Sequence, residues 1–414
     1  MTPSPGLPPS PWIGRSHAEL AELARELLLA GHLIDRSGMP QLIARFGREG
    51  MTEVAIDEWM SASPIYAPRM QRLLGFEGDT VEVIFKGLQL DIGAPPEFMD
   101  FRLELDDDHH GRFQLAHCGA LMDVEPMGEE FVVAMCHTIE DPTFDATAVA
   151  TNPRARMRPV HRPPRTPADR SPHCEWTVTI EPAAEPVPFP ARAAALSTSA
   201  AAKVPMAERP AELPLDDGWA DYSGALDPDL VLERFASATL AAILDEVALQ
   251  GQLLSRGFLV PVAERVGDDA VDIGAHQLTG IAGLTTKRLA AVLGAGPDLE
   301  GIAAVLAVHP MFLPRSYVAL RLEPGAGELL VTIDACPALD EPDGLTWPAI
   351  LAAGHDEPVA SAVQCLAPHA RVERLGSTSW RVRIDPDTEP APEPDDVLMT
   401  EFSTGAAFTF HRRR

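Results

Sequence analysis

The chain carries the stretch WTVTIEP at Trp176–Pro182, which returns as WRVRIDP at Trp380–Pro386. Three further pairs of segments match in the same order. They are Gly31–Arg36 with Gly251–Arg256, Arg69–Gly75 with Arg288–Gly294, and Glu125–Gly128 with Glu341–Gly344. Because the separation drifts only from 220 to 204 residues along the series, the matches indicate an internal duplication rather than chance. The fold is therefore expected to contain two copies of one unit.

Hydrophobic periodicity predicts the same order of elements in both copies. Apolar stripes predict helices that begin near Ser16 and Asp227. Alternating side chains predict strands at 101–105, 112–118 and 174–180 in the first copy, with a helix at 129–138, and strands at 317–322 and 329–336 in the second. This order predicts an α+β fold, a tandem duplication of N-terminal helices followed by a small antiparallel sheet with an inserted helix.

Composition divides the chain further. We expect a disordered N-terminus over residues 1–15, a first copy at 16–182, a linker rich in proline and alanine at 183–214, a second copy at 215–388, and an acidic, proline-rich tail at 389–414 in which 402–410 adds an edge strand. Each copy is long enough to bury its own core.

The formal net charge of -28 argues against nucleic acid and anionic membranes as partners, because both would repel the molecule. No basic-then-apolar signal pattern precedes Trp12, and no apolar run approaches the length of a membrane span. Five cysteines, an odd and small number, fit reduced thiols better than a disulfide framework. We therefore expect a cytoplasmic protein, with homo-oligomerisation left open.

Three doublets of histidine and cysteine stand out in the first copy: His117-Cys118, Cys136-His137 and His173-Cys174. Thiolates and imidazoles are the ligands that bind zinc and, in some sites, iron. The same pairs also occur in thiol nucleophiles, where a histidine activates a cysteine. A third interpretation is plain packing, with buried thiols and hydrogen-bonded histidines.

The second copy serves as a control for these doublets, because it has lost most of their polar groups. Matching positions hold Ala335-Cys336, Ala352-Ala353 and Ser377-Thr378. The loss of three separated histidines is hard to explain by packing and indicates one site. The predicted metal ligands are His117, His137, His173 and Cys174, with zinc or iron as the cofactor. Cys118, which is retained as Cys336, is expected to be structural.

A basic segment lies between the second and third doublets. Its arginines Arg154, Arg156, Arg162 and Arg165 are expected to bind a small anionic molecule, since guanidinium groups pair with carboxylate and phosphate. The alternative is a solvated loop that balances nearby acids.

The predicted catalytic groups are His137, Glu140 and Cys136. Glu140 follows His137 by three residues and shares its helical face if the helix continues, so it could orient the imidazole or move a proton. His32, Asp57 and Glu58 are expected to be ordinary surface residues, although Gln252, His276 and Gln277 replace them in the second copy.

Residues 112–141, with a strand that ends in Cys118 and a helix that carries Cys136 and then Glu140, resemble the 2-amino-thiazoline-4-carboxylate hydrolase family and the related 4-vinyl reductase small-molecule-binding domains. The resemblance implies an α+β ligand-binding fold, a pocket lined by these three residues and, for the hydrolases, opening of a small ring that bears a carboxylate. The chain departs from that pattern by adding His117, His137 and His173 and by duplicating the unit.

These observations predict a hydrolase, metal- or thiol-dependent, that acts on a small carboxylate or acyl-carrier substrate in the first copy, while the second copy is a supporting pseudo-domain. One alternative is a binding or sensing protein that holds a metal or a small ligand without turnover. Another is an interaction module whose cysteines are only packed.

Overall fold

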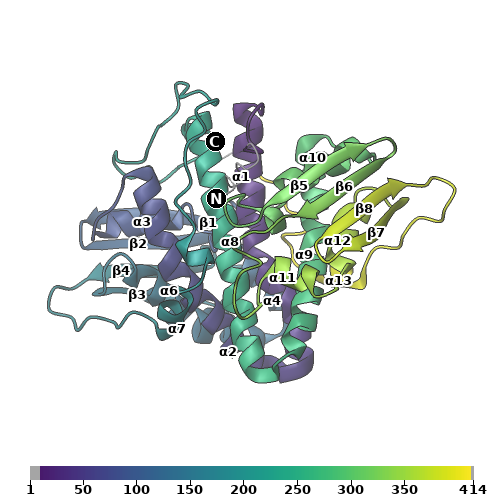
Figure 1. The fold of residues 1–414 in the computed structure, drawn as a ribbon. Coiled ribbons are helices and arrows are strands. Elements are labelled where there is room, and N and C mark those ends of the chain that lie inside the picture. Colours follow the sequence, from purple (N-terminus) through teal and green to yellow (C-terminus); the bar gives the residue numbers. More distant parts are fainter. Residues whose placement is uncertain (1–9, 412–414) are drawn as a thin grey trace.

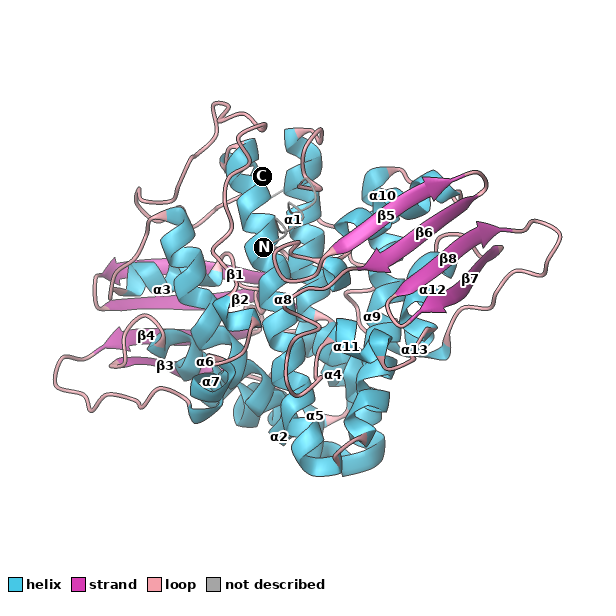
Figure 2. Cartoon of the chain, in the orientation of Figure 1, coloured by secondary structure: helices cyan, strands magenta, loops and turns pink. Residues whose placement is uncertain are grey.

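The computed structural model describes residues 10–411, and two copies of an α+β unit lie side by side in it (Figure 1). Four helices form the middle of the molecule: α1 (His17–His32), α2 (Ile34–Leu74), α8 (Ser237–Val266) and α9 (Asp269–Leu293). Figure 2 shows one sheet on either side of these helices. The predicted α+β duplication is confirmed.

The first copy continues from α2 into a four-stranded antiparallel sheet of order β1-β2-β4-β3. Its elements are α3 (Val81–Leu88), β1 (Met99–Asp107), β2 (His110–Cys118), α4 (Gly119–Val124), a 3-10 turn (Glu125–Met127), α5 (Glu129–Val133), a π-helix (Ala134–Ile139), α6 (Glu140–Val149), β3 (Ala155–His161) and β4 (Cys174–Ile180).

The second copy repeats this topology with the sheet order β5-β6-β8-β7. Its elements are α10 (Leu299–Val308), β5 (Leu320–Gly325), β6 (Glu328–Ile333), α11 (Trp347–Ala352), α12 (Glu357–Gln364), β7 (Ala370–Gly376) and β8 (Ser379–Ile384). Trp176 of β4 pairs with Phe113, and Trp380 of β8 pairs with Val331. Both tryptophans are fully buried, so the repeated tryptophan anchors each sheet to its helices.

The helical halves of the two copies turn at equivalent glycines. Gly47 interrupts α2 with φ of 68°, and Gly267 separates α8 from α9 with φ of 63°. A residue with a Cβ rarely adopts this conformation, which explains glycine at both places. These glycines are 220 residues apart, the same spacing as the first matched segments of the sequence.

The segments outside the two expected copies are also folded where the structure describes them. Trp12 is buried and donates its indole N–H to Asp245 at 2.9 Å, whereas residues 1–9 of the expected disordered terminus lie outside the described residues. The expected linker contains α7 (Ala191–Leu196), which packs on α2, and a 3-10 turn (Ala201–Lys203). The tail contains α13 (Asp395–Thr400), which packs on α9, and through residue 411 it adds no strand to either sheet.

Within residues 10–411, no helix combines the length and the apolar composition that crossing a bilayer requires.

Candidate functional site

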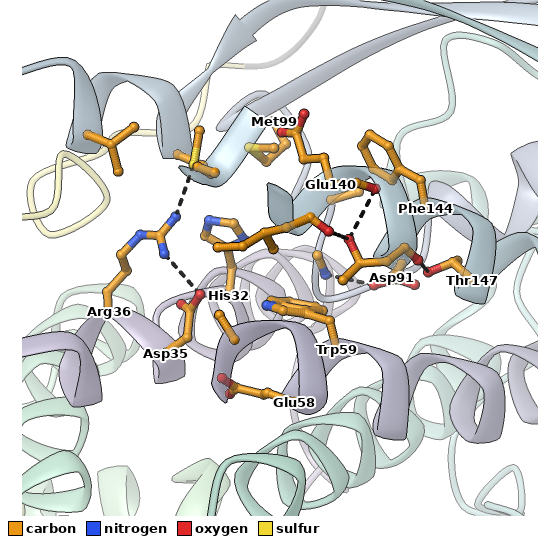
Figure 3. A pocket seen from close by; sticks show the side chains of 18 of the residues that line it. His32, Asp35, Arg36, Glu58, Trp59, Asp91, Met99, Glu140, Phe144 and Thr147 are labelled. Atoms are coloured by element: carbon orange, nitrogen blue, oxygen red, sulfur yellow. Dashed lines mark hydrogen bonds and ion pairs between the residues drawn. The ribbon is translucent and has the colours of Figure 1, made fainter. Parts of the chain in front are cut away.

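A cavity of about 130 Å³ lies inside the first copy, between α2, the segment before β1, the π-helix and α6. Engineered apolar cavities of roughly 150 Å³ admit benzene, so the volume suits a small ring or a short chain. Its walls are mostly apolar and include Trp59, Phe131 and Phe144. Seven ionisable residues share this lining: His32, Asp35, Arg36, Glu58, Tyr66, Asp91 and Glu140. Figure 3 shows Asp35 and Arg36 on one side and Glu140 and Phe144 on the other.

A break between helices α1 and α2 positions His32 and Asp35 at the cavity. Helix α1 ends at His32 and α2 begins at Ile34, whereas the matching segment Gly251–Arg256 lies inside the uninterrupted helix α8. The break falls next to His32 and Asp35, both of which line the cavity.

Several buried polar atoms around this cavity lack hydrogen-bond partners in the described part of the chain. They are both ring nitrogens of His32, Oε1 of Glu58 and Oε2 of Glu140. His32 is 4% exposed and Glu58 is 1% exposed. Since buried polar groups are nearly always hydrogen-bonded in native proteins, their concentration around one cavity points to a ligand site.

Burial shifts the ionisation of these groups. It raises the pKa of Glu140 to about 8, although Arg162 opposes the shift, and it raises the pKa of Asp91 to about 6. Burial and the charge of Arg36 lower the pKa of His32 to about 3. At pH 7 His32 is therefore neutral, Glu140 mainly protonated and Asp91 mainly ionised.

Asp35 influences the ionisation of a second buried carboxyl, that of Glu58. Burial raises the pKa of Glu58 well above its usual range, and the nearby charge of Asp35 raises it further, while Arg36 opposes both effects. Burial also raises the pKa of Asp35. The pair therefore holds a proton more tightly than either acid would in water.

Arg36 is the only arginine or lysine among the cavity-lining residues, all of which the structure describes. Its guanidinium is already paired: Nη1 lies 2.9 Å from Asp35 Oδ2, and Nε lies 3.4 Å from Asp123 Oδ2. Its Nη2 lies 3.9 Å from the sulfur of Met135. Little positive charge is left for a bound anion.

The π-helix separates Glu140 from His137. A π-helix has more residues per turn than an α-helix, so residues three apart no longer share a face. Glu140 lines the cavity, whereas His137 places Nε2 2.7 Å from the carbonyl oxygen of Pro163. The expected pairing of the two side chains presumed a regular helix, and this segment departs from one.

The three thiols of the first copy are buried beside the cavity, and none of them lines it. Burial raises the pKa of Cys118 to about 12 and moves the pKa of Cys136 and of Cys174 further above the usual range. Thiols in such surroundings stay protonated and are poor nucleophiles. The sulfur of Cys118 accepts the N–H of Leu121 at 3.3 Å and so caps α4.

The structure brings two of the four predicted metal ligands together. The ring centroids of His117 and His173 are 5.8 Å apart, and Nδ1 of His173 accepts the backbone N–H of Cys118 at 3.1 Å. His137 faces Pro163 instead. Among residues 10–411, no three His, Cys, Asp or Glu side chains gather in an arrangement that could hold a metal ion.

The predicted anion-binding arginines mostly have partners within the protein. Arg165 forms a bidentate ion pair with Glu125 at 2.7 and 2.8 Å, and Arg162 pairs with Asp141. Arg156 donates to backbone carbonyls, among them that of Ala155 at 2.8 Å. Arg154 keeps a buried Nε without a hydrogen-bond partner in the described chain.

His32 and Glu58 were expected at the surface, and this was wrong, because both lie inside the helical half of the first copy. Their replacement by Gln252 and Gln277 in the second copy is the sequence signal that would have found them. Gln252 donates its amide to Pro310 and Leu313, and Gln277 donates to Ile34.

Thus, where the first copy has ionisable groups around a cavity, the second has amides bonded to the backbone. Asp57 does lie near the surface, in an ion pair with Arg192 at 3.0 Å.

Comparison of the chain with protein-family models, with curated proteins and with solved structures finds no match.

Proposed function

We propose that the first copy is an acid–base catalyst for a small organic molecule, bound in the cavity between α2, the π-helix and α6, and that the second copy supports its fold. One observation carries the proposal. The buried polar atoms of His32, Glu58 and Glu140 surround a single cavity and lack partners within the described chain. A ligand with hydrogen-bonding groups would satisfy them.

The charges of the cavity favour a ligand with a protonated amine. Four carboxyl groups line it, those of Asp35, Glu58, Asp91 and Glu140, against the one guanidinium of Arg36, which Asp35 and Asp123 already neutralise. The aromatic walls suit a cation as well, because their ring faces attract positive charge. A free carboxylate would find no unpaired cation there, so this ligand differs from the small anion expected from the sequence.

Two of the carboxyls suit proton transfer near neutral pH. The pKa of Glu140, raised to about 8, makes it a proton donor, and the pKa of Asp91, raised to about 6, leaves it ionised as an acceptor. Tyr66 donates to Asp91 at 2.8 Å and holds it in place. Such a pair serves hydrolysis, the reaction expected from the sequence, with water as the nucleophile instead of a protonated thiol.

The zinc or iron site expected at His117, His137, His173 and Cys174 stays a prediction. Elemental analysis of the purified protein tests it, and bound metal that is lost in His173→Ala would favour it. The acid–base proposal does not depend on it, because the cavity lining includes none of these four residues.

The experiment that tests the proposed function compares matched ligands and two variants. Amines of benzylamine size, their isosteric alcohols and their isosteric carboxylates are titrated calorimetrically into wild type, Glu58→Gln and the near-surface control Asp57→Asn at pH 7. We expect the amines to bind wild type and Asp57→Asn, and to bind Glu58→Gln at least about tenfold more weakly, as for the loss of a buried charge partner. Preference for carboxylates, or binding that Glu58→Gln leaves unchanged, would refute the assignment.

A further inference from the structure

The tail of the second copy bonds to a buried acid of the first. Asp123, at the end of α4, has a fully buried side chain. Its carboxylate accepts the hydroxyl of Ser403 at 2.6 Å, and the backbone N–H and the hydroxyl of Thr404 at 2.6 and 2.7 Å. The same carboxylate faces Nε of Arg36 at 3.4 Å. Asp123 therefore links the tail to a residue that lines the cavity.

The second copy contains the reciprocal arrangement. Glu341 is buried, faces Arg256 at 3.6 Å, and accepts the backbone N–H of Ala201 at 3.0 Å and the hydroxyl of Tyr317 at 3.2 Å. Ala201 follows α7, which comes after the first copy in the sequence and packs on its helix α2. Each copy thus sends an extension to the buried acid of the other.

The sequence repeats in the two extensions. Leu196–Ala201 reads LSTSAA after α7, and Phe402–Ala407 reads FSTGAA after α13. The sequence and the preceding helix match, and each extension ends at a buried acid that faces the equivalent arginine, Arg36 or Arg256, although the repeat places Glu341 opposite Glu125 rather than Asp123. We therefore regard the two extensions as related parts of the duplicated unit.

Aromatic contacts connect the same tail to His32. The ring of Phe408 lies 5.2 Å from Phe98 and stacks on His117 at 6.2 Å, with 14° between their planes. Phe98 in turn lies edge-on to His32 at 5.4 Å. The tail therefore supports the cavity wall at His32 as well as at Arg36.

The tail is also held at its base by the second copy. Arg288 of α9 donates to the carbonyls of Gly405 at 3.2 Å and Ala406 at 3.0 Å, and pairs with Glu26 of α1 at 2.6 Å. These contacts hold the backbone near Thr404 against both copies.

We propose that residues 401–410, here named the C-terminal strap, complete the site of the first copy, with Asp123, Ser403 and Thr404 acting as positioning residues for Arg36. Donors from the strap disperse the charge of Asp123, which leaves Arg36 shared between Asp123 and Asp35. Without the strap donors, Asp123 attracts Arg36 more strongly, and Arg36 then neutralises less of the charge of Asp35. The ligand-binding consequence rests on the proposed function, whereas the coupling between Arg36 and the strap does not.

The sign of the effect on ligand binding follows from the groups around Glu58. Asp35 raises the pKa of Glu58 and Arg36 lowers it, so movement of Arg36 toward Asp123 makes Glu58 hold its proton more tightly. An amine needs ionised Glu58. When amine affinity is plotted against pH, loosening the strap should therefore move the midpoint of the curve to higher pH. A purely structural role would not move this midpoint.

The test uses the full chain and two independent measurements. Hydrogen exchange of the Thr404 amide reports strap docking without any ligand, and amine titration against pH reports the site. We expect Ser403→Ala/Thr404→Val to speed exchange and to weaken amine binding about tenfold, within the usual range of coupling between sites. Thr404→Ser alone, which keeps a hydroxyl at this position, should stay close to wild type in both. Tyr317→Phe, which removes a hydrogen bond to the buried Glu341 of the second copy, should leave both unchanged.

The outcomes separate the two proposals. Arg36→Met should slow exchange at Thr404 severalfold, because Asp123 no longer shares its charge with the guanidinium and attracts the strap donors more strongly, as the reciprocity of coupling requires. Unchanged exchange in Arg36→Met would overturn the coupling, whether or not any amine binds. A strap variant with faster exchange but an unaltered pH midpoint would overturn the positioning role. Failure of every amine to bind wild type would instead refute the proposed function alone.

Discussion

Glu58 and Gln277 occupy matching positions of the two copies, but only Glu58 lines the cavity. Both leave a buried Oε1 without a hydrogen-bond partner in the described chain, whereas Gln277 also donates its amide to the carbonyl of Ile34 at 3.1 Å. A buried carboxyl costs more free energy than a buried amide unless something binds it. The first copy therefore keeps an unfavourable group that the second has replaced, which is the pattern expected of a functional site.

Replacing Glu58 with glutamine should stabilise the protein at neutral pH. Because the folded-state pKa of Glu58 is raised, the folded form holds a proton that the unfolded form releases above its ordinary pKa, so wild type loses stability as the pH rises. Urea unfolding of wild type and Glu58→Gln at pH 4 and pH 7.5 measures this. The variant should gain stability at pH 7.5 and gain little at pH 4; equal curves at both pH values would contradict the burial of Glu58.

Glu140 should impose a second alkaline dependence. Its pKa rises to about 8 in the folded state, so between its unfolded value of 4.5 and about 8 the folded protein binds the extra proton. Stability should fall through this window by up to about 1.4 kcal/mol per pH unit. Glu140→Gln should flatten the slope, whereas Asp141→Asn should only narrow the pH window slightly, because the charge of Asp141 is the smallest contribution to the raised pKa of Glu140. A slope that persists in Glu140→Gln would exclude Glu140 as its source.

His32 should make the protein sensitive to acid. Because its folded-state pKa is lowered to about 3, only the unfolded chain gains a proton between pH 6.5 and 3, and stability is lost as the pH falls through this window. At pH 5 the loss is about 2 kcal/mol. His32→Gln, which copies Gln252 of the second copy, should remove this loss. Thermal unfolding at pH 5 and 7 checks it, and an equal acid loss in the variant would argue against a buried neutral imidazole.

The thiols of the first copy should resist alkylation. Burial raises the pKa of Cys118, Cys136 and Cys174, so the reactive thiolate is scarce at pH 7.5. Cys365, the only cysteine that is not fully buried in the structure, should react first. Mass spectrometry of native protein treated with iodoacetamide measures the order. Early modification of Cys136 would contradict this order and would support a role of Cys136 as a thiol nucleophile.

The duplicated fold could be predicted because its signals are local and occur twice. Alternation predicted a strand at 174–180, and β4 has these same bounds. It also predicted a strand at 112–118, and β2 begins two residues before that range. The inserted helix expected at 129–138 is α5 followed by the π-helix.

The site was predicted less well, because its residues are brought together by irregular backbone. Glu140 was expected to be a catalytic group beside His137, and it does line the cavity, yet its separation from His137 depends on a π-helix that periodicity does not reveal. His32 and Glu58 are far apart in sequence, on helices interrupted near Leu33 and at Gly47. Only their replacement by glutamine in the second copy marked them.

The tail escaped prediction for a different reason. Its acidic and proline-rich composition indicated only a tail with one edge strand at 402–410, but Ser403 bonds to an acid 280 residues away in the sequence. Composition reports local preference and carries no information about such a distant partner.

The most direct test of the central claim is calorimetric titration of a benzylamine-sized amine into wild type at pH 7 in two buffers of different ionisation enthalpy. If Glu58 ionises to hold a cation while Glu140 keeps the proton that it donates, binding should release protons, and this release should largely disappear in Glu58→Gln. Tighter binding of the isosteric carboxylate, or amine binding with no proton release, would contradict a carboxyl-lined site for a cationic ligand.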